Sequence, residues 1–574
     1  MALMDGAEPL DDEAPFADEP TQWTFEDLLS LVGPMGWWQI NILFWPNVLG
    51  FFANAACMTV LYFQITPEHS CSVEGGFPLD SHWSIEQRLN ISSPATIGAK
   101  GEPVFDACRQ WAANFTQLSA NFDEAYAEFE AMNVTAGKKC EHWDYNRTVD
   151  MSRTAVTDFD LVCDDKFGAE VSQTAYMIGC LVGAIVGGYL SDNFGRKWPF
   201  VIGGILAALT ALATAAVPSL WLLILCRFVF AFFTYVNLNC IIVLTLESTT
   251  SKWRVWIGAL FFIPGAMGYA FSGLFAYLLR DWRLLQIAVS APCLVVVLLI
   301  WLLPESPRWL LAKGRVAEAK KTLEQAARWN GGCLPDDADF DQIEQTIKEE
   351  DTAPQESILH VFEMRRWTPS HPRLALRAVN LFCIWFVCAL VYYGISLNIG
   401  AFAGSQFLNN SISGAVEIPA YILCVPLLWW GRKKSLLLTM ILAAACLLII
   451  PWMDSNSGDA GHKGSWVLFT FAMLGKFAIS ISFNVAYVIT TEIYPTVVRN
   501  SGLSTSSAIG RIGSALAPYL ASIGKFNPHW AWTAPVIFGC LSLAAAGLAL
   551  FLPETKGKRL PEHLDEELAD EVVV

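Results

Sequence analysis

Apolar runs of about 20 residues recur along this chain, and they constrain its fold more than any other feature. Only a helix or a closed barrel satisfies its own backbone hydrogen bonds inside a bilayer, and barrel strands would alternate polar and apolar residues over about 10 positions. These runs are apolar throughout, so we predict an all-α membrane protein. Its expected transmembrane helices lie near 38–63, 170–190, 199–217, 220–243, 255–278, 284–303, 376–397, 406–429, 435–452, 465–489, 502–522 and 531–552.

Composition agrees with this fold class and excludes others. The 574 residues are 54% hydrophobic and 16% charged, which is more apolar surface than a soluble core of this size needs. The net charge of -17 lies mainly in the N-terminal tail, the first long loop, the central loop and the C-terminal tail, as expected for solvated segments. Nothing in it suggests nucleic-acid binding. The first 37 residues lack a basic stretch before an apolar run, so we expect no cleaved signal peptide.

Basic residues in the short loops predict the orientation. They fall on one face of the membrane, which the positive-inside rule makes cytoplasmic, although Arg280 and Arg283 on the other face are an exception. Both termini are therefore expected in the cytoplasm. The residues that set this orientation are Arg196, Lys197, Lys252, Arg254, Arg432, Lys433, Lys434, Arg499, Lys556, Lys558 and Arg559.

The long first loop, 64–168, is expected outside the cell. It holds four N-glycosylation sequons, at Asn90, Asn114, Asn133 and Asn146. It also holds an even set of cysteines in an oxidising compartment, which predicts two disulfides with three pairings open. These cysteines are Cys71, Cys108, Cys140 and Cys163. The chain has no metal-ligand spacing such as Cys-x-x-Cys, so no metal site is predicted.

Short motifs recur six helices apart, which indicates a duplication. An acid precedes an arginine by seven residues after the fourth span (Glu247, Arg254) and after the tenth (Glu492, Arg499). The other recurring pairs are Gly195-Arg196-Lys197 with Gly431-Arg432-Lys433, and Leu303-Pro304-Glu305 with Leu552-Pro553-Glu554. We therefore predict an acidic cytoplasmic tail (1–37), a six-helix bundle (38–303), a cytoplasmic helical linker (304–374), a second six-helix bundle (375–552) and a cytoplasmic tail (553–574).

In such parallel repeats a solute binds near the midplane between two bundles that rock about it. Charged motifs at the cytoplasmic ends can form ion pairs between the halves that break when the protein opens inward. The alternative is that these residues cap helix ends and set topology. The candidate gating residues are Asp192, Arg196, Glu247, Arg254, Glu305, Arg308, Glu492 and Arg499.

Several of these motifs resemble a known family. Gly188-Tyr-Leu-Ser-Asp-Asn-Phe-Gly-Arg-Lys197 is similar to the signature loop of the major facilitator superfamily. Arg280-Asp-Trp-Arg283, Pro304-Glu-Ser-Pro-Arg-Trp-Leu310 and Glu492-Ile-Tyr-Pro-Thr-Val-Val-Arg-Asn500 resemble the organic cation, organic anion and carnitine transporter family. Val416-Glu-Ile-Pro-Ala-Tyr421 most resembles its carnitine and zwitterion branch and the invertebrate relatives. The resemblance implies a major facilitator fold that transports small organic ions.

Two ionisable residues within predicted spans are candidate solute ligands, because intramembrane charges are costly. Arg511 offers a planar fork suited to a carboxylate. The resemblance implies aspartate at this position in cation carriers and arginine in anion and carnitine carriers. Glu417 could pair with Arg511, bind a substrate ammonium, or bond backbone freed by Pro419. At Tyr421 some anion carriers have lysine, so that second cation is missing here. Together Arg511 and Glu417 favour a zwitterion.

Aromatic faces could hold the ammonium of such a solute. Trp385 and Tyr392 lie seven residues apart on one helical face, beside Tyr393. The resemblance implies that these three line the cavity together with Asn237, Phe261 and Asn484. The alternative is lipid contact or helix packing, because the chain has 36 Phe, 23 Trp and 14 Tyr. Asn54 is either a helix-helix hydrogen bonder or a ligand of substrate or sodium.

The leading hypothesis is transport of a small zwitterion, such as carnitine, a betaine or an amino-acid-derived amine, by alternating access in a plasma membrane. An organic anion exchanger is the alternative; an organic cation transporter and a nontransporting receptor rank below it. No catalytic or ATP-binding motif is present, so neither an enzyme nor a primary pump is expected. We expect a monomer in the lipid bilayer with no cofactor, except a coupling Na+ or H+.

Overall fold

The structure is a computed structural model that describes residues 23–558, with gaps. The residues left undescribed within that range are 74–82, 98–102, 133, 135, 146–150, 301–302, 336–339, 353–363, 366–367, 370–371, 403, 457–465 and 527–531. The predicted glycosylation sites Asn133 and Asn146 lie outside the described residues.

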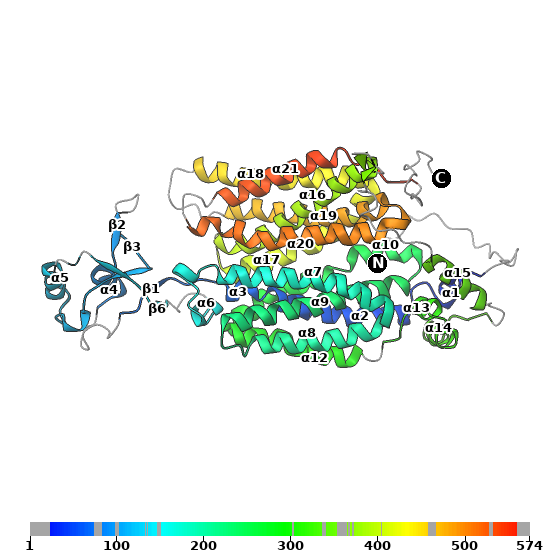
Figure 1. The fold of residues 1–574 in the computed structure, drawn as a ribbon, viewed down its shortest axis with the longest axis horizontal. Helices are drawn as coiled ribbons and strands as arrows, with labels where there is room; N and C mark the ends of the chain where they lie inside the picture. Colours follow the sequence, from blue (N-terminus) through cyan, green and yellow to red (C-terminus); the bar gives the residue numbers. More distant parts are fainter. Residues whose placement is uncertain are drawn as a thin grey trace, which may run out of the picture.

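Long helices running roughly side by side form most of the molecule, which confirms the all-α fold (Figure 1). Nine helical segments of the described chain are long and apolar enough to cross a membrane; the shorter apolar α12 and α21 and the more polar α20 lie beside them. The first group is α2 (Trp37–Met58), α7 (Gly168–Phe194), α8 (Lys197–Thr214), α9 (Leu220–Glu247), α10 (Ser251–Leu260), α11 (Ile263–Leu279) and α12 (Trp282–Ile300). The second is α16 (Pro372–Asn398), α17 (Gln406–Trp430), α18 (Arg432–Asn456), α19 (Trp466–Ile493), α20 (Thr496–Phe526) and α21 (Thr533–Ala549).

We call the first group the N-terminal half and the second the C-terminal half. Within the N-terminal half, α9 packs against α7 and α8; within the C-terminal half, α16 packs against α20 and α18 against α19. Glycine permits the close approach of α7 to α9, because a Cβ at Gly179 or Gly183 would overlap the carbonyl groups of Phe228 and Phe232. Small residues serve this purpose where lipid removes the hydrophobic drive for helix association.

A small cysteine-rich domain projects from one end of the helices, the left end in Figure 1, which we call the loop end. Its disulfides join Cys71 to Cys140 and Cys108 to Cys163, which selects one of the three possible pairings. The short α3 (Val60–Phe63) continues the span of α2 and leads into this domain. The elements of the domain are β1 (His69–Cys71), α4 (Ile85–Ser92), β2 (Ala95–Ile97), β3 (Pro103–Phe105), β4 (Arg109–Trp111), η1 (Phe115–Gln117), α5 (Phe122–Ala131), β5 (Gly137–Lys139), β6 (Trp143–Tyr145), α6 (Ala155–Asp158) and η2 (Cys163–Asp165). The strands pair antiparallel as β1 with β6, β2 with β3 and β4 with β5.

Two of the predicted glycosylation sites are described, and both side chains are exposed. The amide oxygen of Asn114 accepts hydrogen bonds from the backbone nitrogen and the hydroxyl of Thr116, at 3.2 and 2.7 Å. Asn90 lies on α4. Glycosylation at both remains a prediction.

Short helices cover the opposite end of the molecule, which we call the motif end. They are α1 (Phe25–Val32), α13 (Pro307–Ala312), α14 (Val316–Asn330) and α15 (Phe340–Thr352), followed by the strand pair β7 (Met364–Arg365) and β8 (Thr368–Pro369). Asn330 ties α14 to α2: its amide oxygen accepts from the Trp38 backbone nitrogen at 3.0 Å, and its amide nitrogen donates to Gln39 at 2.9 Å.

The two halves touch at the loop end through α11 with α17 and α7 with α20. The Tyr269 hydroxyl donates to Ser413 Oγ at 3.0 Å, and the rings of Tyr62 and Phe407 stack with centroids 6.1 Å apart. A further 3₁₀ turn, η4 (Ile399–Ala401), precedes α17. Toward the motif end the halves instead border a cavity of about 1590 Å³, lined by residues of both. The helix arrangement is therefore closed at one end and open at the other.

Candidate functional site

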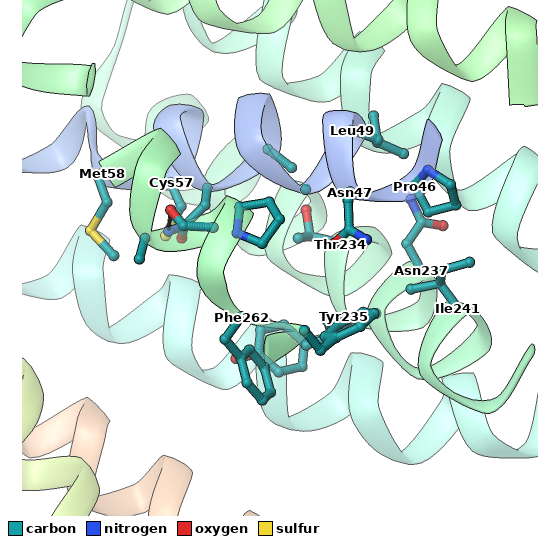
Figure 2. A pocket seen from close by; sticks show the side chains of 18 of the residues that line it. Pro46, Asn47, Leu49, Cys57, Met58, Thr234, Tyr235, Asn237, Ile241 and Phe262 are labelled. Carbon is teal, nitrogen blue, oxygen red and sulfur yellow. Dashed lines mark hydrogen bonds between the residues drawn. The ribbon is translucent and has the colours of Figure 1, made fainter. Parts of the chain in front are cut away.

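We call the cavity of about 1590 Å³ toward the motif end the wide cavity. A smaller cavity of about 240 Å³, which we call the central cavity, adjoins it. Figure 2 shows it from close by, with Asn47 and Cys57 of α2 on one side and Tyr235 and Phe262 on the other. The residues that line both cavities mark where they join: Tyr235, Leu238, Phe261, Phe262, Asn484, Tyr487 and Arg511. Both halves contribute to this junction, as a solute site between rocking bundles requires.

Arg511 of α20 lies at the junction, with 7% of its surface exposed. Its guanidinium carbon lies 4.6 Å from the ring centroid of Tyr235, which comes from α9 in the other half. None of the ion pairs found among the described residues includes Arg511. A buried guanidinium without a carboxylate keeps donors available for an anionic group of a solute.

Glu417 of α17 lines the central cavity, and its partner is a residue that the sequence analysis did not consider. It forms a 2.9 Å ion pair with Lys476 of α19, rather than with Arg511. The hydroxyls of Tyr392 and Tyr421 donate to its two oxygens at 2.7 and 3.2 Å. Of the partners left open for Glu417, Arg511 does not pair with it in this structure, because Lys476 of α19 occupies the carboxylate. Within the described residues, the backbone freed by Pro419 does not bond to Glu417 either.

Lys476 is the residue that the sequence analysis missed. Its surface is entirely buried, its ammonium donates to Ser396 Oγ at 2.6 Å, and it lies 4.6 Å from the ring centroids of Tyr269 and Tyr392. A lysine within a long apolar run is costly in a membrane, and that signal could have found it. Arg227 of α9 carries the same signal.

Arg227 lies near the loop end rather than in the central cavity. Its guanidinium donates to Gln173 at 2.6 Å and lies 5.0 Å from the ring centroid of Phe63 and 5.1 Å from that of Tyr176. These contacts join α7 and α9, so its position indicates helix packing.

The other predicted cavity residues divide into two sets. Tyr392, Tyr393, Phe261, Asn237 and Asn484 all line the central cavity. Trp385 lines neither of the two cavities. It is 1% exposed, donates to Thr490 Oγ1 at 2.9 Å and has its ring centroid 4.4 Å from that of Tyr487. In this structure Trp385 therefore takes the alternative role, helix packing, and the Tyr487 ring that it contacts lines both cavities.

Asn54 takes one of its two expected roles. Its amide nitrogen donates to the backbone oxygen of Gly265 at 2.6 Å, which joins α2 to α11. It also lines the central cavity.

The duplicated motifs form two matching clusters at the motif end. In the N-terminal half, Arg196 contacts Glu247 through two nitrogens at 3.1 and 2.8 Å, while Glu305 accepts from the backbone nitrogen of Arg196 at 2.8 Å. Ser306 donates to Glu247 at 2.5 Å. Asp192 adds an ion pair to Arg196 at 3.4 Å. Burial raises the pKa of Glu305, outweighing the backbone bonds that stabilise its carboxylate.

The C-terminal half repeats this arrangement with different residues. Arg432 pairs with Glu492 at 3.0 Å, and Glu554 accepts from the backbone nitrogen of Arg432 at 2.8 Å. Thr555 donates to Glu492 as Ser306 does to Glu247. Among the described residues, each ion pair of these clusters joins two residues of the same half. Pairing between the halves in another conformation stays a prediction.

The remaining gating candidates differ between the halves. Arg254 pairs with Glu26 of α1 at 3.0 Å instead of with Glu247. Arg499 donates to the Tyr494 backbone oxygen at 3.3 Å and forms no ion pair within the described part of the chain. Arg308 lines the wide cavity.

Known proteins resemble this chain over most of its length. The family described as "Sugar (and other) transporter" matches residues 135–567. The "Organic cation transporter protein" of Drosophila melanogaster is 35% identical over 550 residues, covering 94% of each chain. The "Organic cation/carnitine transporter 2" of Homo sapiens is 30% identical over 553 residues, covering 95% of this chain and 94% of its own.

Solved structures show the same fold at lower sequence identity. The inward open xylose transporter XylE from E. coli has a TM-score of 0.55 and 18% identity, covering 71% of this chain and 91% of its own. A partially occluded inward open form has a TM-score of 0.55 and 15% identity, covering 92% and 100%. At this identity the likeness concerns the fold alone.

Proposed function

This chain belongs to the sugar (and other) transporter family of the major facilitator superfamily, among the organic cation and carnitine transporters, and from that premise we propose that it carries a small carboxylate-bearing zwitterion. It is a multi-pass membrane transporter whose relatives move organic solutes. Carnitine, betaines and amino-acid-derived amines are the solutes proposed. Family membership alone does not give the substrate class, which is our proposal.

The position of Arg511 carries this proposal. Its guanidinium is buried at the junction of the two cavities, lies on Tyr235 of the opposite half and has no carboxylate partner in the described structure. A solute carboxylate held there would contact both halves. A simple organic cation would instead meet a like charge in a region of low dielectric.

Ring faces, rather than Glu417, supply the proposed ammonium site. Glu417 already has Lys476 and two tyrosine hydroxyls as partners. Phe262 lies 6.2 Å from Tyr421 and 6.4 Å from Tyr487, centroid to centroid, and all three line the central cavity. Each cation–π contact contributes about 0.5 to 2 kcal/mol, so several rings could hold a quaternary ammonium.

An organic anion is the second candidate, and the Lys476–Glu417 pair favours it. Glu417 and Arg511 are the two charged residues that line the central cavity in the described structure. Because Lys476 balances Glu417, Arg511 is left as the unmatched charge of this region. A solute with net negative charge would match that excess.

Alternating access accounts for the closed and open ends. The positive-inside rule, applied to the short basic loops, supports a cytoplasmic position for the motif end. The wide cavity would then open inward while α11 and α17 close the outer side. We place the protein in the plasma membrane with both termini in the cytoplasm; coupling to Na+ or H+ belongs to the same proposal.

Radiolabelled uptake into expressing cells tests the solute class. Glycine betaine and choline share a quaternary ammonium and differ in the carboxylate, and glutarate is an anion without an ammonium. We expect betaine to accumulate faster than choline, and Arg511→Ala to reduce betaine uptake by about a hundredfold or more. Arg511→Lys should retain part of it, because it keeps the charge and loses the fork. Uptake with and without Na+, and at two external pH values, tests coupling.

Arg328→Ala is the control, because Arg328 lies on α14 with a side chain 75% exposed. Surface biotinylation shows whether each variant reaches the membrane. Unchanged betaine uptake in Arg511→Ala would refute the proposal. Uptake of glutarate but not betaine by the wild type would establish the second candidate instead.

A further inference from the structure

The buried pair of Lys476 and Glu417 presents only one of its charges to the solute. Glu417 lines the central cavity, whereas Lys476 lines neither cavity and has 0% of its surface exposed. A solute in the cavity can therefore approach the carboxylate but not the ammonium. The pair thus presents the negative charge of Glu417 to the cavity, while the positive charge of Lys476 stays enclosed by protein.

The ammonium of Lys476 is held in place from several directions. It donates to Ser396 of α16, pairs with Glu417 of α17, and lies against the rings of Tyr269 of α11 and Tyr392 of α16. Tyr269 belongs to the N-terminal half and donates to Ser413. With both halves enclosing it, Lys476 cannot turn toward the cavity in this conformation.

The carboxylate of Glu417 is nearly saturated by these neighbours. One oxygen accepts from Tyr392 at 2.7 Å and pairs with Lys476 at 2.9 Å, while the other accepts from Tyr421 at 3.2 Å. Removing one partner of a buried ion pair leaves an uncompensated charge, which seeks a new counter-ion. Here the cavity is where such a counter-ion could come from.

We infer that Lys476 determines the charge specificity of the transporter by occupying Glu417 as its internal counter-ion, which prevents that carboxylate from serving as a binding site for organic cations. Lys476 is thus a positioning residue that does not touch the solute. The inference rests on the proposed function, since it assumes that Arg511 selects the carboxylate. It predicts that one buried side chain separates zwitterion transport from cation transport on this scaffold.

Lys476→Met is the first test, because methionine keeps the length and apolar stem of lysine and packs well beside aromatic rings. The readout is the ratio of choline to glycine betaine uptake in the same cells. We expect this ratio to rise about tenfold or more, because the freed Glu417 binds an ammonium. A purely structural role would lower both uptakes and leave their ratio unchanged.

The double variant Glu417→Gln with Lys476→Met is the matched control, because it removes the carboxylate as well. Its ratio should return to within about twofold of the wild type. A double variant that keeps the raised ratio would overturn the inference, because the effect would not pass through Glu417.

A charge exchange, Glu417→Lys with Lys476→Glu, keeps the pair neutral and protects the test if Lys476→Met fails to fold. It places a cation on the cavity wall, so the ratio of glutarate to betaine uptake should rise several-fold. Unchanged ratios in a surface-expressed Lys476→Met variant or in a surface-expressed exchange variant would overturn the inference. The Arg511→Ala result is separate: if Arg511→Ala leaves betaine uptake intact, the proposed function fails whatever Lys476→Met shows.

Discussion

The two halves of the molecule carry the same cluster at the motif end and different charges in the membrane. Arg196, Glu247 and Glu305 in one half correspond to Arg432, Glu492 and Glu554 in the other, down to the hydroxyl that donates to the central acid. In the membrane interior, both charged residues that line the central cavity come from the C-terminal half.

This difference separates two tasks. The proposed rocking mechanism would need equivalent rigid ends on both bundles, and the matching clusters provide such ends. Solute choice needs an uneven arrangement of charge, so the midplane diverges. Among the described residues, the N-terminal half contributes Tyr235, next to Arg511, and the neutral Asn237 to the central cavity, but no charged side chain.

Among the variants that test this comparison, the largest loss of uptake should come from the clusters around Arg196 and Arg432 at the motif end. Arg196→Ala and Arg432→Ala each remove a multidentate, partly buried arginine, at a cost of about 2 to 3 kcal/mol in stability. We expect each to reduce uptake to below about a tenth while leaving the choline-to-betaine ratio unchanged. Thermal unfolding of purified protein should show a larger loss for Arg196, whose side chain is 9% exposed against 23% for Arg432.

Arg315→Ala is the control for both, since Arg315 pairs with Glu318 on the surface with side chains 48% and 56% exposed. It should change neither uptake nor unfolding measurably. If one cluster variant shifted solute preference, the separation of tasks between clusters and midplane would be wrong.

An intermediate effect is expected where the halves meet. A Cβ at Gly414 would overlap the backbone of Ala270 on α11, whereas a Cβ at Gly547 meets nothing within 4 Å. Gly414→Ala should hold the halves apart at the loop end and reduce uptake about three- to tenfold, and Gly547→Ala should not. Cys57 lines the central cavity. In Gly414→Ala, a membrane-impermeant thiol reagent should therefore modify Cys57 more than in the wild type, as measured by peptide mass spectrometry. Unaltered Cys57 labelling would contradict a closed loop end.

The smallest effect concerns Trp385. Trp385→Phe keeps a ring against Tyr487 and loses the hydrogen bond to Thr490, which contributes about 1 kcal/mol. Unfolding should shift slightly, and betaine uptake should stay within about twofold of the wild type. Tyr393→Phe, on the cavity wall, should change the half-saturating betaine concentration more. A larger change in the half-saturating betaine concentration for Trp385→Phe than for Tyr393→Phe would indicate that Trp385 contacts the solute.

The sequence by itself determined the helical fold, the duplication and the candidate role of Arg511. These follow from properties local to the chain: the length of apolar runs, motifs at helix ends and a charge inside an apolar segment. By the same rule Lys476 was visible in its span, and a stricter search for intramembrane charges would have found it.

Tertiary structure alone decided which of these residues meet. Glu417 had several possible partners in the sequence, and the packing of α19 against α17 selects Lys476. Trp385 and Tyr392 share a helical face in the sequence, but in the structure the Trp385 ring packs against Tyr487. The pairing of the four cysteines was open in the same way. The physical reason is that a partner depends on the rotation and neighbours of each helix, which distant residues fix through packing and which no local pattern contains.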